Sequence, residues 1–265
     1  MIRNESPPMA RCRQAGSAWR QRMKRIVDIL FSATALIVLS PLLLLLAFVL
    51  RLTGEGYVLY RQERVGRGGR IFPLYKFATM LKDSPNLSGG LLTRQGDPRI
   101  LPVGRVLRAT KINELPQLFN VLLGDMTLIG PRPQARAHFE LFPAHVKKEI
   151  VKVRPGLSGV GSIIFRSEDA VMARCAKDQD RCYEEDIAPY KGELELWYVR
   201  RQSFALDLLL MLLTIWVVVF PASRRYARFL RNLPRPSSPI LSTHLALSVV
   251  LIGCCIPELL LSLRF

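Results

Sequence analysis

The longest apolar run of the chain lies near its N-terminus. Residues 29–50 comprise 22 positions without a charged side chain, and about 20 apolar residues in an α-helix are long enough to cross a bilayer. Ser40 and Pro41 interrupt the run in its middle. Proline removes one helical hydrogen bond and bends the helix axis, and a neighbouring serine hydroxyl can bind the carbonyl group that is left free. The pattern predicts either a kinked spanning helix or a helix–break–helix hairpin that enters and leaves the membrane on one side.

The charges on the two sides of this run favour the hairpin. Segments rich in Lys and Arg tend to stay on the cytoplasmic side of a membrane, and both flanks are basic. The basic residues are Arg11, Arg13, Arg20, Arg22, Lys24 and Arg25 before the run, and Arg51, Arg61, Arg64, Arg67 and Arg70 after it. Each half of the run has a helical length of roughly 16 Å, about half the hydrocarbon thickness. We expect residues 1–25 to form a basic tail and residues 26–51 a re-entrant membrane hairpin.

The apolar periodicity after the hairpin predicts a small domain that contains both helices and strands. Residues 57–60 and 71–77 are typical of strands joined by a turn rich in glycine and arginine, and residues 126–129 are typical of a short buried strand. Residues 138–153 show an amphipathic helical pattern, which indicates a helix in the membrane interface or one packed in the core. We therefore expect an α+β fold whose main domain covers residues 52–203.

Two further segments follow this domain. Residues 204–221 are apolar apart from Asp207, and their length is marginal for a membrane span. We expect this segment to form a membrane-associated helix or to pack beside the hairpin. Residues 222–265 begin with five arginines and end in an apolar stretch, which Pro257 and Glu258 make short for a second anchor. We predict no function for this basic linker and apolar tail.

Composition narrows the classes of partner and the setting. The net charge of +17 indicates anionic partners, and polyanionic substrates, an anionic membrane surface and nucleic acid would each serve. Nucleic acid is disfavoured because the sequence has no helix-turn-helix pattern, zinc-finger spacing or strand of interleaved basic and aromatic residues. The five cysteines form no CxxC pair and no disulfide framework, which suits a reducing cytoplasm. His138 and His145 are interpreted as surface residues.

Residues 111–133 carry the most chemical information in the chain. Their sequence is KINELPQLFNVLLGDMTLIGPRP. It predicts an amphipathic helix that Gly124 stops. At the other end Asn113 is a good N-cap, Pro116 suits the first turn and Glu114 complements the positive helix end, which is suited to binding phosphate. The apolar face consists of Leu115, Leu118, Phe119 and Leu122.

Arg132 follows this helix in a rigid setting. Pro131 and Pro133 flank it and restrict the backbone on both sides, so the guanidinium can present its donors without first being ordered. A rigid arginine near a helix N-terminus is suited to holding a phosphate. The alternative is a capped amphipathic helix followed by a proline turn that binds no ligand.

The same stretch resembles the signature of the bacterial sugar transferases, the monotopic phosphoglycosyl transferases. The matching residues are Arg108, Glu114, Leu115, Pro116, Gln117, Leu118, Asn120, Val121, Gly124, Asp125, Met126 and Gly130 to Pro133. The resemblance extends over about residues 24–221 and implies a re-entrant helix broken at a Ser-Pro pair. It also implies an enzyme of the bacterial inner membrane with its catalytic domain on the cytoplasmic face.

The activity implied by this resemblance is the transfer of a sugar-1-phosphate from a nucleotide diphosphate sugar, expected to be a UDP-sugar, to polyprenyl (undecaprenyl) phosphate. Such a step begins the assembly of exopolysaccharide, O-antigen, capsule or glycoprotein glycans. The expected partners are the sugar nucleotide, polyprenyl phosphate and membrane lipid, with no nucleic acid and with a homodimer as one option. Mg²⁺ is the expected cofactor, held by Glu114 and Asp125 together with substrate phosphates.

Asn113 departs from the family pattern, which implies an Asp at this position that attacks the substrate phosphate. An amide is a poor nucleophile and carries no charge for Mg²⁺. In one interpretation the protein is an active transferase in which Glu114 or Asp125 attacks, or in which the polyprenyl phosphate attacks directly. In the other it is a catalytically impaired protein that binds nucleotide sugar or lipid phosphate as a scaffold. We take Glu114, Asn113 and Asp125 as the candidate catalytic residues.

Three basic residues are expected to bind the substrate phosphates. Arg108 and Arg132 belong to the signature itself, and Lys76 stands where the resemblance implies a substrate-binding lysine. The active transferase is favoured because a decayed site is expected to lose its other polar residues, whereas Arg108, Arg132, Glu114 and Asp125 are all retained.

Overall fold

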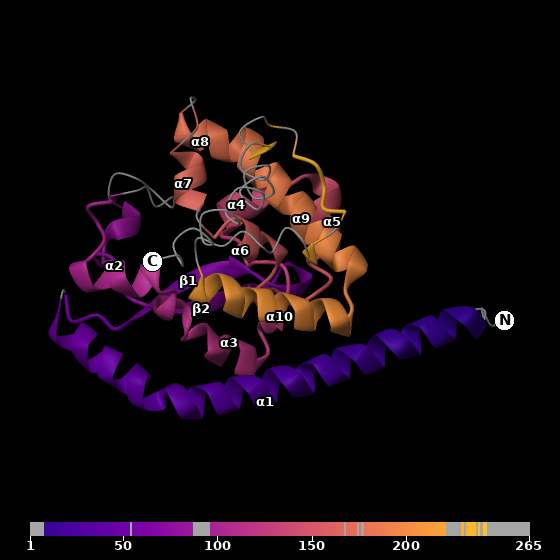
Figure 1. Ribbon diagram of the computed structural model, residues 1–265, viewed down its shortest axis with the longest axis horizontal. Coiled ribbons are helices and arrows are strands. Elements are labelled where there is room, and N and C mark those ends of the chain that lie inside the picture. The colour runs from indigo at the N-terminus through magenta and orange to yellow at the C-terminus, as the bar shows by residue number, and fades with distance from the viewer. Residues whose placement is uncertain are drawn as a thin grey trace, which may run out of the picture.

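The computed structural model describes residues 8–53, 55–86, 96–166, 168–173, 175, 178–220, 229–230, 232–236, 238 and 241–242. In this part of the chain helices surround two small sheets (Figure 1), which agrees with the predicted α+β class. The helices are α1 Pro8–Leu52, α2 Pro102–Ala109, α3 Gln117–Leu123, α4 Arg136–Glu140, α5 Ala144–Ile150, α6 Val160–Ile164, α7 Glu168–Met172, α8 Gln179–Cys182, α9 Ala188–Arg201 and α10 Phe204–Val219. The strands are β1 Leu59–Val65, β2 Ile71–Phe77, β3 Thr127–Ile129 and β4 Gly156–Ser158.

Helix α1 bends but is not interrupted. It passes through Ser40 and Pro41 as one helix, and it bends before its C-terminal end reaches the side of the domain near α2 (Figure 1). Pro41 has no N–H for the carbonyl group of Ile37, and the Ser40 hydroxyl donates to this carbonyl at 2.8 Å. The compensation expected of Ser40 is confirmed. Within the described residues, Trp19–Leu52 is the one helical stretch that is long and apolar enough to cross a membrane.

The part of α1 just before the apolar run is bound to the domain by buried polar groups. One Asp28 carboxylate oxygen accepts the backbone N–H of Leu128 at 3.0 Å, and the other accepts the Thr127 hydroxyl at 2.8 Å. One turn earlier Lys24 forms an ion pair with Asp207 of α10 at 2.9 Å. Because both residues of α1 are partnered by β3 or α10, this part of the helix has a fixed place on the domain.

The last part of α1 contacts the same domain. Leu50 is 1% exposed and forms a small apolar cluster with Phe77 of β2 and Leu107 of α2. The charged segment before the apolar run and the end of that run are therefore both attached to one folded unit.

Strands β1 and β2 form an antiparallel hairpin in which Leu59 pairs with Phe77 and Val65 with Ile71. The prediction for β2 is confirmed, whereas the first strand begins later and runs further than residues 57–60. The sequence pattern did not show the full strand, because most of its residues are polar. One side of the strand faces solvent, and the other carries Tyr60, Gln62 and Arg64, which line a cavity described below.

Strands β3 and β4 form the second sheet and are parallel, with Thr127 opposite Gly156 and Ile129 opposite Ser158. All three residues of β3 are buried, which agrees with the short buried strand expected at residues 126–129. The backbones that follow β3 and begin β4 lie very close together. A Cβ atom added to Gly156 would lie 2.1 Å from the Gly130 nitrogen, so only glycine fits at this position.

The single helix expected at residues 138–153 is wrong in its length. The structure has α4 and α5 instead, with Pro143 as the residue before α5. Pro143 has no N–H to donate to the preceding turn and suits the start of a helix, so it separates α4 from α5. Of the two environments left open for this segment, the core is the correct one, since Val146 is 0% exposed and Ile150 8%.

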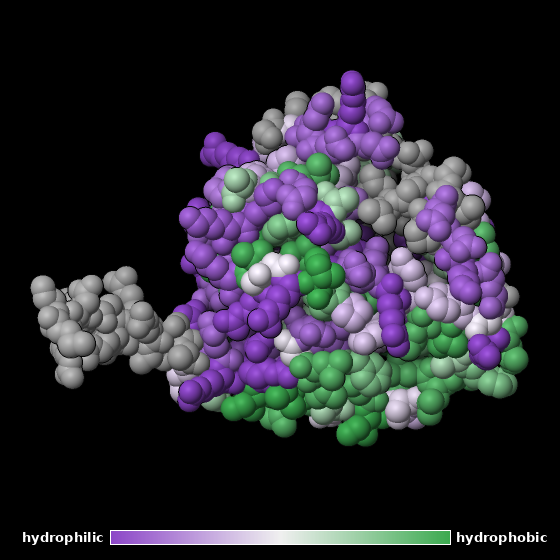
Figure 2. All heavy atoms as spheres, turned by 180° about the vertical axis from the view of Figure 1, so that it is seen from behind, coloured by the Kyte–Doolittle hydropathy of each residue, from purple (hydrophilic) through white to green (hydrophobic). Residues whose placement is uncertain are grey.

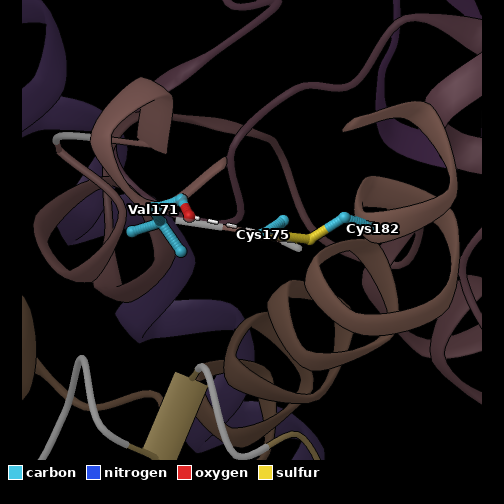
Figure 3. Close-up of a disulfide and its surroundings, with 3 residues drawn as sticks. All are labelled: Val171, Cys175 and Cys182. Carbon is cyan, nitrogen blue, oxygen red and sulfur yellow. Dashed lines mark hydrogen bonds between the residues drawn. A yellow bond between two sulfur atoms is a disulfide. The ribbon is translucent and has the colours of Figure 1, made fainter. Parts of the chain in front are cut away.

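One cysteine pair is bridged in the structure, although the sequence shows no disulfide framework. Cys175 and Cys182 form a disulfide between the end of α7 and the end of α8, with their Cα atoms 6.4 Å apart (Figure 3). The sequence did not indicate this pair by a CxxC motif, because the two residues are seven positions apart. The short helices bring them within the usual range for a bridge.

Helix α10 packs beside the domain on the side where α1 lies (Figure 1). Leu210, Leu213 and Val217 of α10 are buried, whereas other large apolar side chains of α1 and α10 are exposed. Figure 2 shows these hydrophobic residues gathered along the lower edge of the molecule. The exposed members include Leu30, Ile37, Leu44 and Phe48 of α1 and Leu212 and Ile215 of α10. Most of the predicted tail, residues 243–265 included, lies outside the described residues.

Candidate active site

A cavity of about 670 Å³ lies between the β1–β2 hairpin, α6 and α9, and it also opens against α10. Much of its polar lining is cationic. Cationic side chains on its wall include Arg64, Lys76, Arg108, Lys111, Arg132 and Arg166. Such a concentration of positive charge in a confined space favours a ligand with several negative charges.

Arg132 and Glu114 meet inside this cavity. The Nη2 atom of Arg132 lies 2.9 Å from Oε1 of Glu114. Burial raises the pKa of Glu114, but the charges of Arg132, Lys76 and Lys111 outweigh this effect and hold the pKa well below its usual range. Glu114 is therefore ionised at neutral pH, and its partner raises the pKa of Arg132 in turn.

Lys76 projects from β2 into the same space. Burial lowers the pKa of its ammonium group to about 7, and the nearby charges of Arg64 and Arg132 act in the same direction, against the opposing effect of Glu114. A buried lysine surrounded by cations loses its proton easily. An anionic ligand would restore the charge, so Lys76 can respond to phosphate binding.

Asn113 lies at the cavity in a 3-10 turn, Ile112–Glu114, and not at the start of a helix. Helix α3 begins at Gln117, with Pro116 as its N-cap residue and no side-chain cap. The prediction that Asn113 caps this helix is wrong, because Lys111 adopts a left-handed conformation (φ 62°) that starts a separate turn. Asn113 is 6% exposed, and its Oδ1 atom has no hydrogen-bond partner among the described residues.

The buried face of α3 is partly polar. Asn120 is 0% exposed; its Oδ1 atom accepts the N–H of Tyr75 at 3.0 Å and its amide donates to the carbonyl of Pro73 at 2.8 Å. These bonds hold α3 against β2, whereas Phe119, expected on the apolar face, is 47% exposed. The predicted stop at Gly124 is confirmed by its left-handed conformation (φ 98°).

Of the remaining predicted site residues, Arg108 lies at the cavity and Asp125 does not. Arg108 lines the cavity and its guanidinium contacts the Met80 sulfur at 3.7 Å. Asp125 is not one of the described residues that line the cavity; its carboxylate lies 3.4 Å from the Asn120 amide, at the far end of α3. Within the described residues, no cluster of three or more His, Cys, Asp or Glu side chains is placed to hold a metal ion.

The structure adds residues that sequence reasoning missed. Lys191 of α9 pairs with Glu168 of α7 at 2.9 Å, and both line the cavity. His138, expected on the surface, also lines it, with its ring 4.8 Å from that of Tyr183, and burial lowers its pKa to about 4. These residues belong to separate helices without a shared motif, so no local pattern in the sequence indicates their meeting. The prediction for His145 is confirmed, since its side chain is 59% exposed.

One wall of the cavity is apolar. Phe31 of α1 and Met211, Ile215 and Val218 of α10 line it. The cavity therefore joins a cationic interior to apolar side chains on the face where α1 and α10 are exposed. An amphiphile with an anionic head group and a hydrocarbon tail matches both environments.

Comparison with known proteins identifies the relatives of the chain. The profile of the family described as bacterial sugar transferase matches residues 19–221. The chain is 37% identical over 202 residues to the UDP-N-acetylgalactosamine-undecaprenyl-phosphate N-acetylgalactosaminephosphotransferase of Aeromonas hydrophila, covering 74% of the chain and 44% of the relative. It is 42% identical over 144 residues to the UDP-glucose:undecaprenyl-phosphate glucose-1-phosphate transferase of Caulobacter vibrioides, covering 53% of each. The chain thus spans about half the length of these relatives.

Proposed function

Because this chain belongs to the bacterial sugar transferase family, we propose that it moves a sugar-1-phosphate from a nucleotide diphosphate sugar, in particular a UDP-sugar, to undecaprenyl phosphate. The reaction would begin the assembly of a polysaccharide or another glycan. The observation that carries the proposal is the cavity itself, which combines Lys76, Arg132 and Glu114 with the apolar wall from α1 and α10. Both related enzymes named above carry undecaprenyl phosphate in their descriptions.

The chemistry exchanges one phosphoanhydride for another. An oxygen of the acceptor phosphate bonds to the β-phosphorus of the donor, the bond from this phosphorus to the bridging oxygen breaks, and the nucleoside monophosphate leaves with that oxygen. The protein has to align the two substrates and neutralise their charge. Arg132, Lys76 and Arg108 line the cavity and supply that charge.

Direct attack by the acceptor is the route that this site supports. Asn113 has a neutral amide, and Glu114 is held as a weakly basic carboxylate by its ion pair with Arg132. Neither is a strong nucleophile. The alternative function, a binding or scaffold protein without turnover, draws its support from the same Asn113. We favour the transferase because the phosphate-binding residues of the cavity are retained.

Mg²⁺ is part of the proposal and fits the site in part. The Asn113 Oδ1 atom is a buried oxygen without a partner among the described residues, and Glu114 follows it in the same turn. Carboxylate and carbonyl oxygens suit Mg²⁺, which usually binds one or two protein groups and the substrate phosphates. A bound Mg²⁺ would supply positive charge to the phosphates. The role expected of Asp125 stays a prediction, and its place outside the cavity gives it no support.

Two contacts of α1, one just before the apolar run and one at its end, support the proposed membrane arrangement. Asp28 is hydrogen bonded to β3, and Leu50 packs against β2 and α2. A helix that crossed the bilayer would carry one of these contacts to the other side, so we propose that α1 enters and leaves the membrane on one face. We place the domain on the cytoplasmic face of the inner membrane, where sugar nucleotides are available. The oligomeric state, a homodimer included, enters no step of the reaction.

The function is tested with the full chain purified in detergent. A panel of UDP-sugars is incubated with undecaprenyl phosphate and Mg²⁺; UMP release and the lipid-linked product are measured, and donor binding is measured separately by calorimetry. The transferase predicts that UMP and product appear together and in equal amounts for at least one donor. Donor binding without product across the panel would support the scaffold alternative, and absence of both would remove the proposed function.

A further inference from the structure

Glu195 is a buried carboxylic acid behind the cavity. It is 1% exposed and lies on α9. Its Oε1 atom accepts the backbone N–H of Arg132 at 3.2 Å, and its Oε2 atom has no hydrogen-bond partner among the described residues. Burial raises its pKa to about 7, against the opposing charges of Lys191 and Arg132. Such a group is expensive to bury, which indicates a role besides stability.

Glu195 accepts the backbone N–H of Arg132, which lies between two prolines. Among residues 131–133 only Arg132 has a backbone N–H, because proline has none. The carbonyl group of Arg132 accepts the side-chain amide of Gln134 at 3.2 Å. Both peptide groups of Arg132 are therefore held, and Glu195 holds the one that the prolines leave.

Helix α6 leaves space for the Glu195 side chain at Gly161. A Cβ atom on Gly161 of α6 would lie 2.3 Å from Oε1 of Glu195, closer than real Cβ atoms approach. Glycine at this position therefore lets α6 pack directly over the carboxylate. The next residue, Ser162, has its hydroxyl 3.5 Å from the Arg132 guanidinium, so α6 contacts both Glu195 and the side chain it serves.

While Glu195 binds the backbone of Arg132, the guanidinium of Arg132 lies in the cavity and pairs with Glu114 at 2.9 Å. We propose that Glu195 is a positioning residue for the transfer reaction: by fixing the Arg132 peptide it aims the guanidinium at the donor phosphates. This inference rests on the proposed function, because it assigns Arg132 to those phosphates. Glu195 itself touches no substrate.

The test is a double-mutant cycle in the full-length protein. Glu195→Met, Arg132→Ala and the double variant are compared with the parent for kcat, for KM of each substrate, and for binding of the UDP-sugar by calorimetry. We expect Glu195→Met alone to lower kcat/KM on the order of 10²-fold, as for a misplaced catalytic group. In the Arg132→Ala background the same change should have an effect below about threefold, because the residues act as a unit.

Two variants separate positioning from general stability. Glu195→Gln retains an oxygen acceptor for the Arg132 N–H and should restore most of the activity. Glu193→Met removes an exposed carboxylate from the same helix and should leave activity unchanged. If Glu195→Met does not fold, Gly161→Ala takes its place in the cycle, since its methyl group displaces the Glu195 carboxylate without removing it.

The outcomes are distinct. Additive losses in the cycle, or no rescue by Glu195→Gln, would overturn the positioning role while the parent remains an active transferase. A parent without product in any donor assay would count against the proposed function instead. The binding cycle then still decides whether Glu195 acts through Arg132, because it needs no turnover.

Discussion

The ion pair between Arg132 and Glu114 joins a proline-flanked loop to a 3-10 turn across the cavity, at 2.9 Å. The arginine keeps the glutamate ionised, and the glutamate keeps the arginine in place while its other donors remain directed at the cavity. The pair lies in the cavity where we propose that the phosphates of a sugar nucleotide bind. It therefore controls both charge and geometry at the proposed reaction centre.

Removal of this arginine should impair transfer. In Arg132→Ala the donor phosphates lose a fixed cation, and we expect kcat/KM to fall on the order of 10²- to 10³-fold, as for a single transition-state donor. UMP release is the measurement. Lys147→Ala is the matched control, since Lys147 pairs with Glu140 on the exposed side of α4 and α5. An equal loss in both variants would show that net charge matters and the cavity does not.

Asn113→Asp should change the kinetic route. Direct attack needs the acceptor, so we expect the parent protein to release no UMP from a UDP-sugar alone. The variant gains a carboxylate at the cavity and should exchange labelled UMP into UDP-sugar without acceptor. Exchange by the parent would contradict direct attack and would indicate a covalent phosphosugar intermediate on another residue. A variant slower than the parent in the full reaction would indicate a site adapted to the amide.

Binding of the donor should take up a proton above neutral pH. The pKa of Lys76 is lowered to about 7 in the free protein, so at pH 8 most of its amine is neutral. Donor phosphates favour the ammonium form and raise this pKa. Calorimetry of UDP-sugar binding in buffers of different ionisation enthalpy should show proton uptake at pH 8 and little at pH 6. Lys76→Met should abolish this uptake, and persistence of the uptake would assign it to another group.

Labelling tests the arrangement of α1. Arg22→Cys and Arg61→Cys place single thiols at exposed sites before and after the apolar run, in a background without the five natural cysteines. A membrane-impermeant thiol reagent should label neither site in intact cells and both in inverted membrane vesicles. Labelling of one site from each side would show a spanning helix.

The cysteine pair tests the placement of the domain. Cys175 and Cys182 are close enough to form a disulfide, but a cytoplasmic domain meets a reducing environment. We expect thiol trapping in lysed cells under acid quench to find both residues as free thiols, and mild oxidation of the purified protein to link them. A bridge already present in the cell would contradict the cytoplasmic placement.

Much of this protein could be predicted from local sequence. The apolar run, the Ser40 hydroxyl that compensates for Pro41, the strands β2 and β3 and the signature with Arg108, Glu114 and Arg132 are properties of neighbouring residues. Hydrogen bonding along a helix and the conformational limits of proline and glycine act over a few positions, so they can be read without a fold.

Tertiary structure decided the rest. The partners of Asp28, the Cys175–Cys182 pair and the meeting of Glu195 with Arg132 depend on helices that come together from distant parts of the chain. Strand β1 was placed poorly because its inward side chains line a polar cavity and break the apolar alternation. Periodicity reports which residues avoid water, but it cannot report which polar groups face one another once water is excluded.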